Sequence, residues 1–206
     1  MSITSDCVLK AFNFNIKKTT NLWNEYDNTL FVDPGFNTGM AYCSPRNELI
    51  EVEVVTIKEV SPLYTLEYRY ERLMSMFRQY VKDKNIFNII CEDIFMRPNS
   101  TRSMEAALSQ SLFKTTNIIG MYRAVALMEG FTFSTIHAHE WRGSMNDKVV
   151  KLRLEKKLYP LIYIKKSIKL GSLEINNKSF DKSILNSHVC SALGMMLHSV
   201  KLLNEE

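Results

Sequence analysis

The sequence contains few glycines, prolines and cysteines. Its 206 residues include 7 Gly, 5 Pro and 4 Cys, which excludes collagen-like, low-complexity and disulfide-rich proteins. The four cysteines are widely spaced and form no Cys-x-x-Cys pair: Cys7, Cys43, Cys91 and Cys190. Neither a zinc knuckle nor a disulfide framework is therefore indicated, and we expect reduced thiols.

Long apolar segments are also missing. No run of about 18 apolar residues occurs, so we expect no transmembrane helix. The first residues, MSITSDCVLKAFNFNIKK, lack the apolar core of a signal peptide. We expect a cytoplasmic protein that is not secreted. Its many Asn, Ile and Lys residues are typical of an AT-rich genome, such as that of a phage or virus, and the compartment would then be the host cytoplasm.

No large excess of one charge is present. The 26 basic and 22 acidic residues give a net charge of +4, which permits a polyanionic partner without requiring one. Positive charge is concentrated between residues 146 and 170, where the only acids are Asp147 and Glu155. Two interpretations stay open on charge alone: a solvated helix face, or a surface that contacts phosphates.

Hydrophobic residues, 46% of the sequence, are enough for the core of one domain. Their spacing predicts strands at residues 29–33, 39–43, 50–57, 87–91 and 131–137. It predicts helices from residue 62 to 81 and at residues 101–130, 147–160 and 183–203. This order indicates an α/β fold with a mixed five-stranded sheet, in which three antiparallel strands precede the parallel additions. We expect residues 1–27 to be an irregular or partly helical extension and residues 28–206 to be the domain.

Two acids stand out because each ends a predicted strand. Asp33 ends the first strand, and Glu92 ends the first strand after the crossover helix. If these strands are neighbours in a right-handed connection, both carboxylates emerge at the same edge of the sheet. Close carboxylates repel unless a cation lies between them, and Mg²⁺ prefers such oxygen ligands. The alternatives are a turn residue before Pro34-Gly35 for Asp33 and a solvated strand end for Glu92.

Two segments resemble a known family. FVDPGFNTGMAY (31–42) and IICEDIFMRPNSTRSM (89–104) are similar to motifs of RuvC-type Holliday-junction resolvases, in the ribonuclease H-like superfamily. The resemblance covers residues 28–203. It implies a ribonuclease H-like fold in which Asp33 and Glu92 hold two Mg²⁺ ions, with Mn²⁺ as a substitute. It also implies a homodimer that cuts branched DNA, and our candidate for the dimer interface is the predicted helix at 101–130.

Other site residues follow from the same resemblance. Phe95 would stack on a base near the junction, although packing beneath the loop is an equal alternative. Lys148 would lie close to the scissile phosphate, with a solvated helix lysine as the alternative. Further candidates for contact with the nucleic acid are Arg97, Arg102, Arg142 and Lys151.

The last motif, HVCSALGMM (188–196), departs from the family pattern. His188 matches the first position, where an imidazole can ligate the metal or orient a metal-bound water. Ser191 stands where the family has an aspartate, and a neutral hydroxyl is a far poorer Mg²⁺ ligand than a carboxylate. Three explanations are open: a naturally impaired relative that is retained for DNA binding, an active-site variant made for study, or compensation by Asp181 or another acid.

The function expected from these observations is a structure-specific endodeoxyribonuclease of DNA recombination and repair. It would resolve four-way junctions by two-metal, Mg²⁺-dependent phosphodiester hydrolysis, with Asp33, Glu92, His188, Lys148 and Ser191 at the catalytic site. One alternative is a catalytically impaired branched-DNA-binding protein of the same fold. A further alternative is a ribonuclease that acts on RNA–DNA hybrids.

Overall fold

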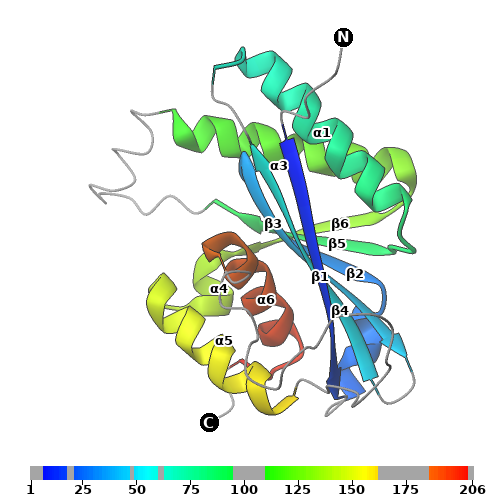
Figure 1. Cartoon of the computed structure of the whole chain (residues 1–206), viewed down its shortest axis with the longest axis vertical. Helices are drawn as coiled ribbons and strands as arrows, with labels where there is room; N and C mark the ends of the chain where they lie inside the picture. Colours follow the sequence, from blue (N-terminus) through cyan, green and yellow to red (C-terminus); the bar gives the residue numbers. More distant parts are fainter. Residues whose placement is uncertain are drawn as a thin grey trace, which may run out of the picture.

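The computed structural model describes residues 7–17, 21–46, 49–59, 63–94, 110–161 and 186–203. A six-stranded sheet in the order β1-β4-β3-β2-β5-β6 forms its centre (Figure 1). The strands are β1 (Cys7–Lys17), β2 (Thr29–Asp33), β3 (Asn37–Arg46), β4 (Leu49–Glu59), β5 (Asn88–Asp93) and β6 (Thr132–His137). The helices are the 3₁₀ helix η1 (Asn21–Tyr26), α1 (Leu66–Lys82), α3 (Ser111–Glu129), α4 (Ala138–Arg142), α5 (Asp147–Leu161) and α6 (Ser187–Ser199).

The sheet has the predicted mixed topology. β2, β3 and β4 form an antiparallel meander, because only short loops connect them. The chain then crosses over through α1 and returns as β5, which pairs parallel to β2, and β6 pairs parallel to β5. The expected α/β fold class is therefore confirmed.

The N-terminal segment was predicted incorrectly. Residues 7–17 form β1, which pairs antiparallel with β4 along its whole length and gives the sheet six strands instead of five. The expectation of an irregular or partly helical lead-in is wrong for these residues. The signal was present in FNFNIK (12–17), where apolar and polar residues alternate as in a half-buried strand, and Ile16 is fully buried.

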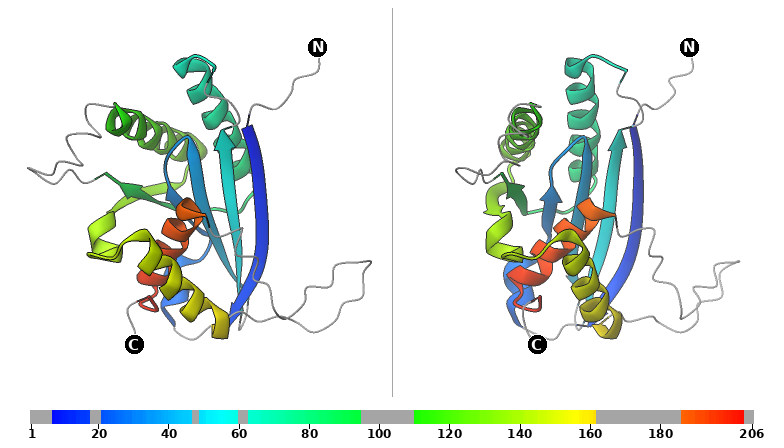
Figure 2. Two further views of the ribbon diagram at one scale, coloured as in Figure 1. Left: turned by 60° about the vertical axis from the view of Figure 1, so that its left-hand side comes forward. Right: turned by 90° about the vertical axis from the view of Figure 1, so that its left-hand side faces the viewer.

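Two separate cores lie on the two faces of the sheet (Figure 2). Successive side chains of a strand point to opposite faces, so Phe31 packs with α4, α5 and α6 while Leu30 and Val32 pack with α1 and α3. All three side chains are fully buried. Burial of each such side chain contributes about 1.5–3 kcal/mol to stability. The alternation along β2 therefore determines the face of the sheet to which the side chain of its last residue points.

α1, α3, α5 and α6 lie where the apolar periodicity predicts helices, whereas the short helix α4 was not predicted. α3 begins at Ser111, and residues 101–109 of the expected helix lie outside the described residues. α6 begins later than expected because Asn186 is its N-cap, accepting a hydrogen bond from the Val189 N–H (2.9 Å). Within the described residues, no helix is both long and apolar enough for a membrane span.

Candidate active site

Asp33 and Glu92 lie on neighbouring parallel strands. The register pairs Val32 of β2 with Cys91 of β5, so the next residue on each strand brings the two acids to the same edge of the sheet. Both side chains belong to the α6 face, because their neighbours two positions earlier, Phe31 and Ile90, pack on that core. The predicted meeting of the two carboxylates is confirmed.

Asp93 belongs to the opposite face of the sheet. It follows Glu92 directly, so its side chain points away from the carboxylate pair. It lies beside His137 at the end of β6, with Oδ2 3.9 Å from His137 Nδ1. Its own Oδ1 accepts a hydrogen bond from the Ile94 N–H (2.8 Å). Of the two consecutive acids, only Glu92 therefore faces Asp33.

α6 brings His188 to this pair. His188 Nδ1 donates a hydrogen bond to Asp33 Oδ2 (2.9 Å). The helix can approach because Gly39 of β3 has no side chain: a Cβ there would lie 2.2 Å from the carbonyl carbon of His188. Asn186, the N-cap of α6, adds a second contact with the sheet, because its Nδ2 donates a hydrogen bond to Thr56 Oγ1 of β4 (3.0 Å). Glycine within a strand is a known sign of close backbone approach.

Ser191 lies one turn after His188 on the same side of α6. Its hydroxyl lowers the pKa of Asp33, so it lies close to that carboxylate. The position to which the resemblance assigns a family aspartate therefore lies close to Asp33 and carries a neutral side chain. Asp181, considered as a compensating acid, lies outside the described residues.

Burial of two acids side by side changes their protonation. Desolvation raises the pKa of Asp33, and this rise is opposed by the hydrogen bond and charge of His188, the Ser191 hydroxyl and the charge of Arg142. Desolvation and the charge of Asp33 raise the pKa of Glu92 from 4.5 to about 8. The hydrogen bond to Asp33 raises the pKa of His188. The site therefore disfavours two uncompensated negative charges.

Two more charged residues belong to the same region. Arg142, the last residue of α4, donates a hydrogen bond from Nη1 to Oδ1 of Asp147, the first residue of α5 (3.0 Å). The charge of Arg142 lowers the pKa of Asp33 and of Glu92. Sequence reasoning named Arg142 only as a contact for the nucleic acid and did not propose Asp147. An acid in the first turn of a helix is common because it interacts favourably with the helix dipole, so nothing in the sequence marks Asp147 as a site residue.

The donor chemistry of the site fits a hard divalent cation. Glu92 Oε2 is buried and has no hydrogen-bond partner among the described residues, and a carboxylate oxygen of Asp33 lies on the neighbouring strand. The part of the chain that is described contains no ready-made cluster of three or more His, Cys, Asp or Glu side chains for a metal. Mg²⁺ requires no such cluster, because it is commonly bound by one or two carboxylates, waters and substrate phosphates.

The remaining predicted residues are placed as follows. Lys148 and Lys151 lie in the first two turns of α5, Lys148 exposed and Lys151 half-buried. The charge of Lys151 acts on Cys190 of α6, which puts this lysine on the side of α5 that faces α6. Three candidates for contact with the nucleic acid fall outside the described residues: Phe95, Arg97 and Arg102.

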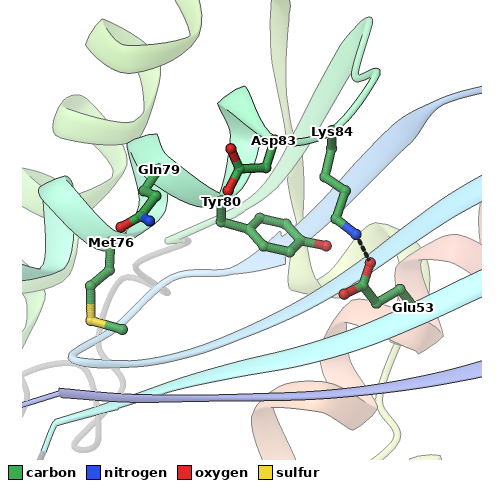
Figure 3. Close-up of a pocket in the computed structure, with 6 residues that line it drawn as sticks. All are labelled: Glu53, Met76, Gln79, Tyr80, Asp83 and Lys84. Carbon is green, nitrogen blue, oxygen red and sulfur yellow. Dashed lines mark ion pairs between the residues drawn. The ribbon is translucent and has the colours of Figure 1, made fainter.

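A cavity of about 420 Å³ lies away from the acids, between α1 and β4 (Figure 3). It is on the α1 face of the sheet and is lined by Glu53, Met76, Gln79, Tyr80, Asp83 and Lys84. Lys84 Nζ pairs with Glu53 Oε2 at 2.5 Å and lies 5.6 Å from the centre of the Tyr80 ring. The buried Glu53 charge is thus already compensated within the protein, and the strand-end acids remain the candidate site.

Known proteins resemble this chain in structure and not in sequence. No protein-family model and no curated protein matches the sequence. The solved Thermus thermophilus RuvC structure has a TM-score of 0.53 and 14% identity, and the alignment covers 82% of this chain and 91% of RuvC. T. thermophilus RuvC in complex with a Holliday junction substrate has a TM-score of 0.52 and 13% identity, over 82% and 90%.

A yeast enzyme is also similar to this chain in structure at low sequence identity. The mitochondrial Holliday junction resolvase Ydc2 has a TM-score of 0.50 and 12% identity, and the alignment covers 86% of this chain and 80% of Ydc2. Identities this low establish shared architecture, while function is carried by the site. The chain has the mixed α/β fold of the RuvC-type resolvases.

Proposed function

We propose that this protein is a metal-dependent endonuclease that cuts branched DNA, with the four-way junction as its main substrate. The observation that carries the proposal is the pair of buried carboxylates, Asp33 and Glu92, on adjacent parallel strands in a RuvC fold. Such a pair is costly in a protein that never binds a cation, because each charge disfavours the other.

The residues have separate tasks in this proposal. Asp33 and Glu92 hold Mg²⁺, or Mn²⁺ in its place, and the ion supplies activation of water and stabilisation of the leaving oxygen. His188 fixes the orientation of Asp33 through the 2.9 Å hydrogen bond from Nδ1. Lys148 and Arg142 contact phosphates near the cut, and hydrolysis leaves 5′-phosphate and 3′-hydroxyl ends. Phe95, Arg97, Arg102 and Lys151 are further proposed contacts for the DNA.

A homodimer would give the two symmetric cuts that a four-way junction requires. The exposed apolar side chains of α3 support this part of the proposal. Phe113, Leu127 and Met128 are 67%, 68% and 61% exposed, which is unusual for three large side chains of one helix. A second copy of the chain that packs on α3 would remove them from water.

The test is a comparison of substrates for the unmodified protein. Equal concentrations of a labelled four-way junction, a linear duplex of the same sequence and an RNA–DNA hybrid are incubated with the protein and Mg²⁺. We expect symmetric nicks in the junction and little cutting of the linear duplex. Preferential cutting of the hybrid would instead favour a ribonuclease, and cutting of all three at similar rates would contradict structure selectivity.

A second candidate function is a catalytically impaired protein that binds branched DNA. The neutral Ser191 favours it, because the family pattern has an acid at this position. Ser191→Asp distinguishes the two functions: if only this variant nicks the junction while both proteins bind it, the native chain is a binding protein.

A further inference from the structure

The site described above has two carboxylates and a neutral third position. We propose that Asp147 is the third acid of this site, acting in the place that Ser191 leaves neutral, and that Arg142 holds its carboxylate until a DNA phosphate binds Arg142. This inference rests on the metal-dependent function proposed above. The acid that the last motif lacks at Ser191 would thus come from a different helix, α5.

The packing of three helices brings Asp147 to the site. Trp141 of α4 is fully buried and packs against Gly194 of α6, where a Cβ would lie only 2.3 Å from its ring. α5 starts a few residues later and packs on the same helix through Val150 and Leu154. Asp147 is the first residue of α5, and its ion pair with Arg142 holds it against the end of α4, which packs on α6.

The electrostatics agree with this placement. The negative charge of Asp147 raises the pKa of Glu92 on β5 and of His188 on α6. It also acts on Cys190, next to Ser191. The charge of Asp147 therefore acts both on a strand-end acid and on residues of α6.

Asp147 is available for such a role because another residue caps its helix. Asn146 Oδ1 accepts the hydrogen bond from the Val149 N–H (3.1 Å), so the start of α5 does not require the Asp147 carboxylate. The Asp147 side chain is 74% exposed and can rotate. It forms an ion pair with Arg142 (3.0 Å between Oδ1 and Nη1), whose side chain is 30% exposed.

The positive charge of Arg142 explains how a third carboxylate can lie near two buried ones. Its positive charge acts on Asp33 and on Glu92 while it binds Asp147 directly. In the protein without DNA, this guanidinium compensates all three carboxylates. Guanidinium groups bind phosphate in a bidentate manner, so a DNA phosphate competes with Asp147 for Arg142 and frees the carboxylate.

The test is Mn²⁺ binding by the protein saturated with an uncleavable four-way junction, whose phosphates occupy Arg142, with the junction alone as the blank; binding is followed by the electron paramagnetic resonance signal of free Mn²⁺. We expect Asp147→Asn to weaken binding roughly 10-fold, as removal of a supporting carboxylate does at other metal sites. Ser191→Asp in the Asp147→Asn background should restore most of the affinity. Asp93→Asn is the matched control, because this strand-end acid lies on the other face of the sheet, and its affinity should equal that of the unmodified protein.

The measurement distinguishes a failure of the proposed role of Asp147 from a failure of the proposed metal site. If Asp33→Asn abolishes Mn²⁺ binding and Asp147→Asn leaves it unchanged, the role of Asp147 is refuted and the proposed function stands. If Asp33→Asn also leaves binding unchanged, the metal site itself is refuted, together with this inference. Thermal melting verifies that each variant is folded. Should Asp147→Asn not fold, Asp147→Ser, which also suits a helix start, gives the same comparison.

Discussion

Individual residues decide the chemistry of this protein, and Glu92 is the clearest case. It is an ordinary acid by type, yet its position next to Asp33 and its burial raise its pKa to about 8. The sequence predicted both acids because each ends an apolar strand. It could not predict Asp147, whose contribution depends on the packing of α4 and α5 against α6.

The raised pKa of Glu92 predicts a pH dependence of stability. Between about pH 4.5 and pH 8 the folded protein keeps a proton that the unfolded chain has released, so the free energy of unfolding falls as the pH rises. The raised pKa of His188 acts in the same direction. In metal-free buffer, Glu92→Gln should flatten this part of the curve, measured by urea denaturation across the pH range. A curve for Glu92→Gln that runs parallel to that of the unmodified protein would contradict the assigned burial.

A bound cation should reverse this trend. Deprotonated Glu92 binds the ion and protonated Glu92 does not, so Mg²⁺ should raise the melting temperature more at pH 8.5 than at pH 6. The measurement is the Mg²⁺-induced shift in melting temperature at the two pH values. Glu92→Gln is the control and should show a smaller shift with little difference between them. An equal shift for both proteins would argue against Glu92 as a ligand.

At the scale of elements, the close approach of α6 to β3 positions the site. The helix carries both His188 and Ser191, and it reaches Asp33 only because Gly39 leaves room for the His188 backbone. The sequence shows Gly39 plainly, but which backbone approaches it depends on a contact between residues about 150 positions apart. β1 was missed for a related reason: its pairing with β4 is distant in sequence.

Gly39→Ala tests this approach. The added Cβ would lie 2.2 Å from the carbonyl carbon of His188, so α6 must shift, and we expect a loss of about 3 kcal/mol in the free energy of unfolding. The shift should also weaken Mn²⁺ binding, because His188 no longer orients Asp33. Gly120→Ala in α3 is the control: no atom lies within 4 Å of its Cβ, and alanine should stabilise the helix by about 1 kcal/mol. Equal stability of both variants would refute the close contact.

At the scale of the whole molecule, the two faces of the sheet have different roles. The α6 face carries the acids, and α3 on the other face exposes large apolar side chains. The fold class was predictable because strand and helix periodicities alternate clearly along the chain. The dimer was implied by the family resemblance alone, and its interface on the predicted helix at 101–130 stays a prediction. The exposed apolar side chains of this helix become visible only once it has been placed on the sheet.

The proposed dimer can be tested through α3. Leu127→Glu combined with Met128→Glu places charges on the exposed apolar part of the helix, and we expect a dimer to dissociate into monomers of 23.9 kDa. Light scattering after size-exclusion chromatography gives the mass. Leu152→Glu on α5, where the leucine is also exposed, is the control and should remain dimeric. An unmodified protein that is already monomeric at micromolar concentration would contradict this interface.

The central claim is that Asp33 and Glu92 together hold a metal that cuts branched DNA. The most direct measurement is nicking of a labelled four-way junction under single-turnover conditions, with Mg²⁺, by the unmodified protein, Asp33→Asn and Glu92→Gln. We predict that each substitution lowers the rate roughly 100-fold or more while junction binding in a gel-shift assay is retained. Nicking by Asp33→Asn at the rate of the unmodified protein would show that the chemistry lies elsewhere.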